Sequence, residues 1–256
     1  MGLLAVLLAG ALTARPQSRH PPNNRPKSDP APAALAVPFP AGEELEYRGG
    51  WQFYTTAATL KLSATEQREF AGRPAWHFQA QVNSLNPLRY IFILDDQYDS
   101  YSDSAGLTSR QFEAHVREQN KREDRISRMS HEGEVASADG AAVRVPEGTR
   151  DPLGALYFLR TVDWAKTPAV SMAVYDGKKL YELRARRGLA SGEVEVPAGT
   201  FTASRIDLRV YERGRELAQI RITVWLANDA ARTPVLLEAE LPFGSVRAEL
   251  SGAETQ

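Results

Sequence analysis

Apolar and polar side chains alternate along most of the chain from residue 39 onward. Successive side chains of a β-strand point to opposite faces of its sheet, so this alternation predicts strands with one buried face and one solvated face. Sheets that are solvated on one face are typically antiparallel, because parallel sheets are usually covered by helices on both faces. The alternation is clearest over residues 60–65, 76–83, 112–116, 206–210, 220–226 and 246–250.

Turn-forming residue pairs that contain glycine separate these segments at the short spacing that β-hairpins need. Strands that follow one another in the sequence are therefore expected to be neighbours in the sheet. About ten or more candidate strands lie between residues 45 and 250, which is too many for one flat sheet. We predict a mainly β fold, a large curled antiparallel sheet or open β-barrel. The turn pairs are Ala71-Gly72, Asp139-Gly140, Asp176-Gly177, Arg213-Gly214 and Phe243-Gly244.

One segment departs from the alternation and has the features of a helix. Asp151 can cap a helix N-terminus, and Pro152 suits the first helical position because its missing N–H needs no partner there. The residues that follow are apolar around most of the helical circumference. We therefore predict one buried short helix over about residues 151–162, which would lie against the concave face of the sheet as a plug or lid.

The first 38 residues are not expected to belong to the fold. Residues 1–14 form a signal-like segment, since an apolar run ends in small residues and meets Arg15-Pro16. Its roughly 13 apolar residues are fewer than the roughly 20 that span a bilayer, which favours a secretory signal, although no Lys or Arg precedes the run. Residues 15–38 predict a Pro-rich disordered linker. Residues 39–251 are then expected to form a single β-rich domain.

Composition and charge narrow the location and the partners. The signal-like segment predicts a periplasmic or otherwise exported protein with no transmembrane span after signal removal. The chain has no cysteine, which excludes disulfides, thiolate metal sites and the lipid-modified cysteine of bacterial lipoproteins. The formal net charge of -1 provides no field that would gather nucleic acid, so nucleic-acid binding is not expected.

A set of segments, taken in order, is typical of one bacterial family. The segments are PFPAGEELEYR from Pro38, DPLGALYFLR from Asp151, DGKKLYEL from Asp176, VPAGTF from Val196 and WLANDAARTPVLLEAELPFGSVRAEL from Trp225. Together they resemble the exported-protein family catalogued as domain of unknown function 3108, over residues 38–250. The resemblance implies an exported β-rich protein and brings no catalytic residues. Gly154 stands where the family leads us to expect a small hydroxyl residue, and Ala57 where we expect glycine.

Motifs for metal, cofactor or catalytic chemistry have little support. His77 and His115 fall on the polar faces of predicted strands, where a solvated or cross-strand hydrogen-bonded histidine is favoured over a metal ligand. No histidine pair has the helical spacing of a zinc hydrolase, and no nucleophile elbow or phosphate loop occurs. We therefore predict no metal site, no cofactor and no catalytic residue, and we favour a non-enzymatic protein.

An acidic run offers oxygen ligands for calcium, but its spacing does not match an EF-hand loop. We interpret it instead as a solvated edge strand whose charges prevent pairing with other chains. The run consists of Asp95, Asp96, Asp99 and Asp103.

Large apolar side chains suggest a function in binding. A curled sheet of about ten strands encloses more volume than its own side chains easily fill, so we expect a cavity for a lipid-like or other hydrophobic small molecule. Two alternatives remain open: an envelope scaffold or assembly factor that contacts other envelope proteins, and a hydrolase of an envelope polymer. The candidate cavity residues are Trp51, Phe53, Trp76, Phe78, Leu156, Phe158 and Trp225.

Overall fold

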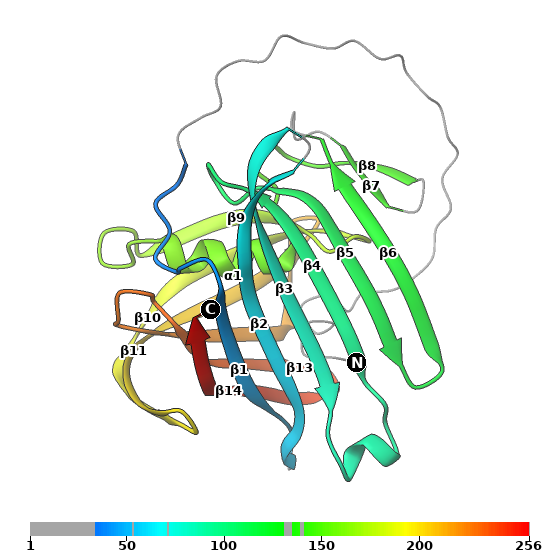
Figure 1. The fold of residues 1–256 in the computed structure, drawn as a ribbon. Helices are drawn as coiled ribbons and strands as arrows, with labels where there is room; N and C mark the ends of the chain where they lie inside the picture. The colour runs from blue at the N-terminus through cyan, green and yellow to red at the C-terminus, as the bar shows by residue number, and fades with distance from the viewer. Residues whose placement is uncertain (1–33, 53, 71, 131–134, 139–140, 256) are drawn as a thin grey trace, which may run out of the picture.

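The computed structural model describes residues 34–52, 54–70, 72–130, 135–138 and 141–255. The predicted signal-like segment and most of the predicted linker lie outside these residues. Within them the chain forms fourteen strands, one α-helix, α1 (Pro152–Thr161), and a 3-10 helix (Leu88–Tyr90) (Figure 1). The strands are β1 (Glu43–Trp51), β2 (Tyr54–Phe70), β3 (Arg73–Ser84), β4 (Asp95–Asp103), β5 (Ser109–Glu118), β6 (Lys121–Met129), β7 (Val135–Ala138), β8 (Ala141–Arg144), β9 (Ala169–Tyr175), β10 (Leu180–Val196), β11 (Gly199–Glu212), β12 (Arg215–Ala227), β13 (Pro234–Leu241) and β14 (Gly244–Thr255).

All fourteen strands belong to one antiparallel sheet with the order β8-β7-β6-β5-β4-β3-β2-β1-β14-β13-β12-β11-β10-β9. Strands that follow one another in the chain are neighbours in each half of the sheet, as the turn pairs predict. The halves meet where β1 pairs with β14, with Glu43 opposite Thr255 and Trp51 opposite Val246. The sheet ends at β8 and β9 and is not closed. The predicted mainly β, antiparallel and curled fold is confirmed.

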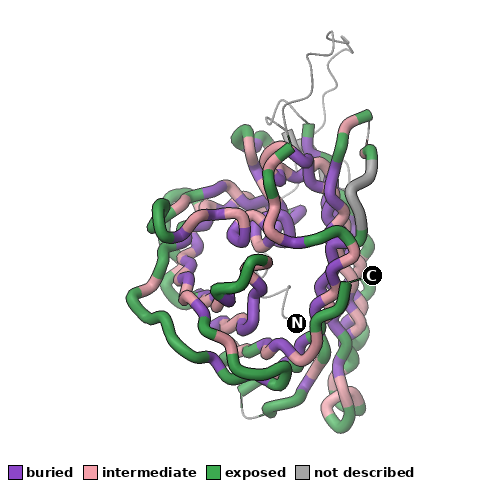
Figure 2. Tube along the Cα trace, turned by 60° about the vertical axis from the view of Figure 1, so that its left-hand side comes forward, coloured by how far each residue is buried: buried purple, intermediate pink, exposed green. Residues whose placement is uncertain are grey.

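The alternation in the sequence corresponds to the two faces of this sheet. On β3 the side chains of Trp76, Phe78 and Ala80 are buried, whereas His77 and Gln79 between them are partly exposed. Buried and more exposed residues follow one another along the strands in the same way in Figure 2. The buried face is the concave one and carries the hydrophobic core.

The helix lies at one end of the curled sheet, which we call the helix end. Its first turn contacts the beginning of β5, and its last turn contacts the beginning of β1 and the β12–β13 connection. The opposite end, called the far end, carries the β1–β2, β3–β4, β5–β6 and β13–β14 connections (Figure 1). The prediction of one short buried helix against the concave face is confirmed, and α1 covers that face near the helix end.

The chain just before α1 links the two sides of the open sheet. The Ser109 N–H on β5 donates to the Thr149 carbonyl at 3.2 Å. The neighbouring Arg150 donates its N–H to Ala173 on β9 and accepts from the Tyr175 N–H, at 3.0 and 2.8 Å. Residues 149–150 therefore stand between β5 and β9 as an extra backbone segment.

A second link across the opening is made by side chains of β6. Arg125 donates to the carbonyl of Asp176, in the β9–β10 turn, at 3.1 Å. The Lys178 ammonium of the same turn lies 2.8 Å from Glu123. Charged groups of β6 thus hold the curled sheet together at a place where no ladder of backbone hydrogen bonds among the described strands closes it.

The last residues of the predicted linker lie against the domain. The Leu35 N–H donates to the Ser104 carbonyl at 2.7 Å, and the side chains of Leu35 and Val37 pack on the core. The folded region therefore includes residues that precede Phe39.

The interpretation of the acidic run as a solvated edge strand is wrong. These residues form β4, which lies between β3 and β5, and Asp96, Asp99 and Asp103 are buried. Each carboxylate is satisfied locally, because Asp96 accepts from the Arg117 N–H and Asp103 from the Gly106 N–H, both at 2.8 Å. A carboxylate that accepts hydrogen bonds from N–H groups can be buried inside a sheet. A run of acidic residues therefore does not by itself indicate an edge strand.

Candidate functional site

The N-terminus of α1 is anchored by a buried carboxylate. The Asp151 side chain accepts from the Gly154 N–H at 2.8 Å, which is the cap predicted from the sequence. It also accepts from the hydroxyls of Ser100 and Ser109, and the Asp151 N–H donates to Ser109. Burial raises the pKa of Asp151, while the hydroxyl hydrogen bonds oppose that increase. The helix is therefore fixed to β4 and β5 at its N-cap residue.

The close packing there accounts for Gly154. A Cβ atom on this residue would lie 2.9 Å from the Ser102 Oγ and 3.1 Å from the Ser109 Oγ. A small hydroxyl residue, which the family resemblance leads us to expect at this position, would have to displace both serines. In this chain the two serine hydroxyls occupy the space instead.

The C-terminal turn of α1 is anchored by a buried ion pair. Arg160 donates to both carboxylate oxygens of Glu43, at 2.5 and 2.7 Å, and to the Ala231 carbonyl at 2.9 Å. Burial would lower the pKa of Arg160, but the hydrogen bonds and charge of Glu43 raise it. Arg232 in turn donates to the carbonyls of Arg160 and Val162. Both ends of the helix are thus fixed. No motif in the sequence indicated the Glu43–Arg160 pair.

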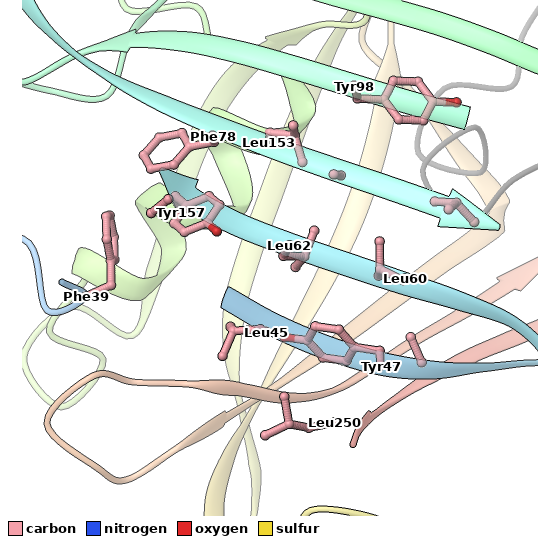
Figure 3. Packing of buried hydrophobic residues seen from close by; sticks show 14 of the residues in the cluster. Phe39, Leu45, Tyr47, Leu60, Leu62, Phe78, Tyr98, Leu153, Tyr157 and Leu250 are labelled. Carbon is pink, nitrogen blue, oxygen red and sulfur yellow. The ribbon is translucent and has the colours of Figure 1, made fainter. Parts of the chain in front are cut away.

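Four aromatic side chains fill the space between the helix and β3. Phe78 stacks on Tyr157 with ring centroids 3.9 Å apart, and Phe39 contacts both rings edge-on (Figure 3). Trp76 lies 5.2 Å from Phe39. The cavity candidates Trp76 and Phe78 are therefore core residues packed against each other and the helix.

An apolar cavity of about 80 Å³, partly open to solvent, lies between α1, β2 and the concave face of β9–β13. Its lining reaches Tyr181 and Val210, near the far end of β10 and β11. Burial raises the pKa of Tyr181, so its hydroxyl stays protonated. The lining consists of Leu60, Leu62, Pro152, Leu153, Ala155, Leu156, Leu159, Val174, Tyr181, Leu183, Leu208, Val210, Ile222, Val224, Leu237, Glu238 and Ala239.

Of the seven cavity candidates, Leu156 lines this cavity. Phe158 lies beneath the Arg150 guanidinium, 3.7 Å from its ring centroid. The Trp225 indole N–H donates to the Glu238 carboxylate at 3.2 Å. Trp51 is the last residue of β1, and its exposed fraction is 37%. Phe53 lies outside the described residues. Sequence reasoning missed the aliphatic lining from β9–β13, although its alternating Leu, Ile and Val were recognised as strands.

On the polar face of β2–β4, three side chains form a hydrogen-bonded row, Thr65, His77 and Asp99. The Thr65 Oγ1 lies 2.8 Å from His77 Nδ1, and His77 Nε2 lies 2.8 Å from an Asp99 oxygen. Burial would raise the pKa of Asp99, but hydrogen bonds from His77, Gln97 and Gln79 lower it. His77 is thus a cross-strand hydrogen-bonded histidine, as predicted, and its ring connects an exposed hydroxyl to a carboxylate.

His115 is also paired with carboxylates on the polar face. Its Nδ1 lies 2.7 Å from Asp124, and its Nε2 lies 3.4 Å from Glu113. The Asp124 hydrogen bond raises the pKa of His115. In the part of the chain that the structure describes, no group of three His, Asp or Glu side chains could hold a metal ion. No described helix has the length and hydropathy needed to cross a membrane.

The outer face of β11–β14 is hollowed by a groove of about 700 Å³ whose lining is strongly charged. The opposite charges in it are paired, for example Arg205 with Asp207 at 2.8 Å and Arg247 with Glu238 at 3.1 Å. Because the charges compensate one another, this groove does not select a ligand by net charge.

Comparison with solved structures shows the fold. A beta-barrel-like protein of domain of unknown function DUF1849 from Brucella abortus is similar over 84% of this chain and 97% of its own, with 12% identity and a TM-score of 0.56. A protein from Bacteroides fragilis described as exported, with a YmcC-like fold, matches over 87% and 100%, with 11% identity and a TM-score of 0.34. One from Parabacteroides distasonis described as a lipoprotein matches over 88% and 100%, with 10% identity and a TM-score of 0.37.

No curated protein matches the chain. A family model does match, over residues 45–251, which is nearly the whole described sheet. The match agrees with the resemblance found in the ordered segments of the sequence. The chain belongs to the family described as protein of unknown function DUF3108.

Proposed function

We propose that this protein is an exported, non-enzymatic binding or carrier protein that holds one narrow apolar chain, such as a fatty acyl chain, in the cavity beneath α1. The observation that carries the proposal is the lining: it is aliphatic apart from Tyr181 and Glu238, and the Glu238 carboxylate is paired with Arg247. Apolar pockets that are partly open to solvent are the usual binding sites for small hydrophobic molecules.

The size of the cavity limits the ligand. Its volume of about 80 Å³ is roughly half of the 150 Å³ of an engineered apolar cavity that takes up benzene. A bulky ring system would not enter without movement of α1, which is fixed at Asp151 and Arg160. A single alkyl chain needs the least cross-section, so its end would occupy the cavity and its polar head would stay in water.

The proposal is tested by a chain-length series. Saturated fatty acids of increasing length would compete with cis-parinaric acid, a fluorescent straight-chain fatty acid, for the purified protein. Each buried methylene contributes about 0.8 kcal/mol, so affinity should rise about fourfold per carbon and then level off when the cavity is full. No binding at any length, together with no lipid in a solvent extract of the protein, would contradict the proposal.

A cavity-filling variant tests the position of the ligand, with a neighbouring exposed substitution as its control. Ala239 lies in the lining on the concave side of β13, and Ala239→Leu would occupy part of the space. We expect at least tenfold weaker binding with unchanged or higher thermal stability, because the added side chain fills a void. The neighbouring exposed variant Glu240→Gln should bind like the wild type. Equal binding by Ala239→Leu would place the ligand elsewhere.

A second candidate function, ester hydrolysis, is favoured by the Thr65–His77–Asp99 arrangement alone. Thr65 sits at a β-bulge, since the register passes from Ala64 opposite Phe78 to Glu66 opposite His77. Bulges often redirect a side chain next to an active site. Thr65 also lines a hollow of about 250 Å³ with Ser63 and Glu44.

In that function His77 would take the Thr65 hydroxyl proton while the oxygen attacks an ester carbonyl. It would return the proton to the leaving alcohol, and water would then release the acyl group by the same route. The test is turnover of p-nitrophenyl butyrate, which Thr65→Ala should abolish and Thr65→Ser should preserve, with His115→Gln as the control. Equal rates for wild type and Thr65→Ala would exclude this function.

A further inference from the structure

The β3–β4 connection at the far end is an apolar tip exposed to solvent. Residues 85–94, LNPLRYIFIL, are apolar except for Asn86 and Arg89. The exposed fractions are 81% for Tyr90, 68% for Ile91 and 42% for Ile93. Scattered exposed apolar residues need no explanation, but three within four residues on one projecting tip do.

Most backbone N–H groups of the tip are hydrogen-bonded within the protein, although the tip is an exposed loop. Six consecutive N–H groups, from Arg89 to Leu94, each donate a hydrogen bond to the protein. The first four donate to carbonyls of the same loop at 2.8 to 3.1 Å. Ile93 donates to the Gln119 side chain at 3.3 Å, and Leu94 donates to the Ser84 hydroxyl at 3.0 Å.

Exposed apolar side chains together with internally bonded N–H groups suit a bilayer better than water. An ordinary surface loop leaves amides for water to satisfy, and such amides are costly in a medium without water. A tip with apolar side chains and paired N–H groups loses fewer hydrogen bonds when it leaves water than an ordinary loop does. Gln119 reinforces it from the β5–β6 turn, because its N–H donates to the Ile93 carbonyl at 2.9 Å and its side-chain amide donates to the Ile91 carbonyl.

Arg89 of the tip and Arg117 beside it are each paired with a carboxylate, so these two arginines do not require an anionic surface. Arg89 makes a two-pronged contact with Asp95, at 2.6 and 2.7 Å. Arg117 makes the same kind of contact with Asp124, at 2.6 and 2.8 Å. The driving force is therefore apolar insertion rather than counter-ion attraction.

The neighbouring β1–β2 turn offers a second contact point at the same end (Figure 1). Trp51 and Tyr54, at its two sides, are 37% and 51% exposed. The Leu85 N–H donates to the Ala57 carbonyl at 2.9 Å, which ties the tip to the beginning of β2. Trp and Tyr are the side chains that favour the boundary between lipid and water.

We propose that the far end of the sheet docks on a lipid bilayer, with the tip of Tyr90, Ile91 and Ile93 inserted among the head groups. A protein partner fits the observations less well, since a stable interface buries roughly 20–30 residues on each side. Three side chains on a projecting tip supply far less than that. The proposal does not depend on an acyl chain in the cavity beneath α1.

The absence of cysteine in the sequence allows a local test in the full chain. A single Ile91→Cys variant would carry an environment-sensitive nitrobenzoxadiazole probe at the tip. Leu189→Cys, at a fully exposed apolar residue of β10, is the matched control. Because each probe reports its own surroundings, other segments that bind lipid do not affect the comparison.

With vesicles of phosphatidylcholine alone, we expect at least a twofold rise in emission and a blue shift for the tip probe, and neither for the control. Addition of phosphatidylglycerol or 0.5 M salt should change the half-saturating lipid concentration less than threefold. The proposal is overturned if both probes respond alike, or if the tip responds only to anionic vesicles and loses the response in salt. A response without lipid that grows with protein concentration would also overturn it, since a second copy would then cover the tip.

Discussion

The link between β6 and the β9–β10 turn allows a quantitative prediction about pH and stability. Glu123 lies 2.8 Å from Lys178, 2.9 Å from Arg125 and 3.3 Å from Lys121. Burial raises the pKa of Glu123, but the three cations lower it by more, so that the pKa falls from 4.5 to about 2. This fall in pKa corresponds to about 3–4 kcal/mol before screening, and solvent and salt screening of the partly exposed charges reduces it to about 1–3 kcal/mol.

Because the pKa is lower in the folded state than in the unfolded state, this stabilisation is complete above pH 4.5 and is lost as the pH falls toward 2. Glu123→Gln should therefore lower the free energy of unfolding by about 1–3 kcal/mol at pH 7. The difference from wild type should shrink as the pH approaches 2. Urea unfolding followed by circular dichroism at several pH values measures both.

Glu240→Gln is the control, because Glu240 is an exposed carboxylate 3.4 Å from Arg221 and does not span the sheet opening. It should change stability by less than about 0.5 kcal/mol at every pH. An equal effect of Glu123→Gln on the free energy of unfolding at pH 2.5 and pH 7 would contradict this prediction. The charge of Glu123 would then not hold the two sides of the sheet together.

Three further predictions concern the anchors of α1. Arg160→Met leaves Glu43 buried without its partner and should lower the free energy of urea unfolding by about 3–5 kcal/mol. The double variant with Glu43→Leu should restore most of this loss. An equally unstable double variant would argue against the pair. Asp151→Ala removes the cap and two hydroxyl partners, so calorimetry should show a loss of about 1–3 kcal/mol, and an unchanged melting temperature would contradict this. Gly154→Ser should cost about 1–3 kcal/mol through crowding, relieved by Ser102→Gly, and a lack of rescue would place the strain elsewhere.

The sequence was sufficient to predict the class of fold and the helix, since both depend on local patterns. Alternation specifies which side chains share a face, and Asp151-Pro152 specifies where a helix begins. Alternation does not specify the neighbours of a strand beyond the next turn. The pairing of β1 with β14 and the interior position of β4 were therefore not predicted.

The candidate site was less predictable because it depends on contacts between distant residues. Glu43 and Arg160 are separated by 117 positions, and neither occurs in a recognisable motif. Large aromatic residues suggested a cavity, but Trp76 and Phe78 fill the core, while smaller aliphatic residues of β9–β13 line the space. Residue size indicates how much volume is filled and does not indicate where volume is left.

The pairing of β1 with β14 has a consequence for the order of assembly. Hairpins between consecutive strands can form as soon as both partner strands are free to fold. The two groups of strands, β1–β8 and β9–β13, cannot be joined by strand pairing until β14 is available, because β14 pairs with both β1 and β13. Completion of the sheet therefore waits for β14, and a chain arrested before it would leave β1 and β13 as open strand edges, with the two half-sheets in contact only through residues 149–150 and the side chains of β6.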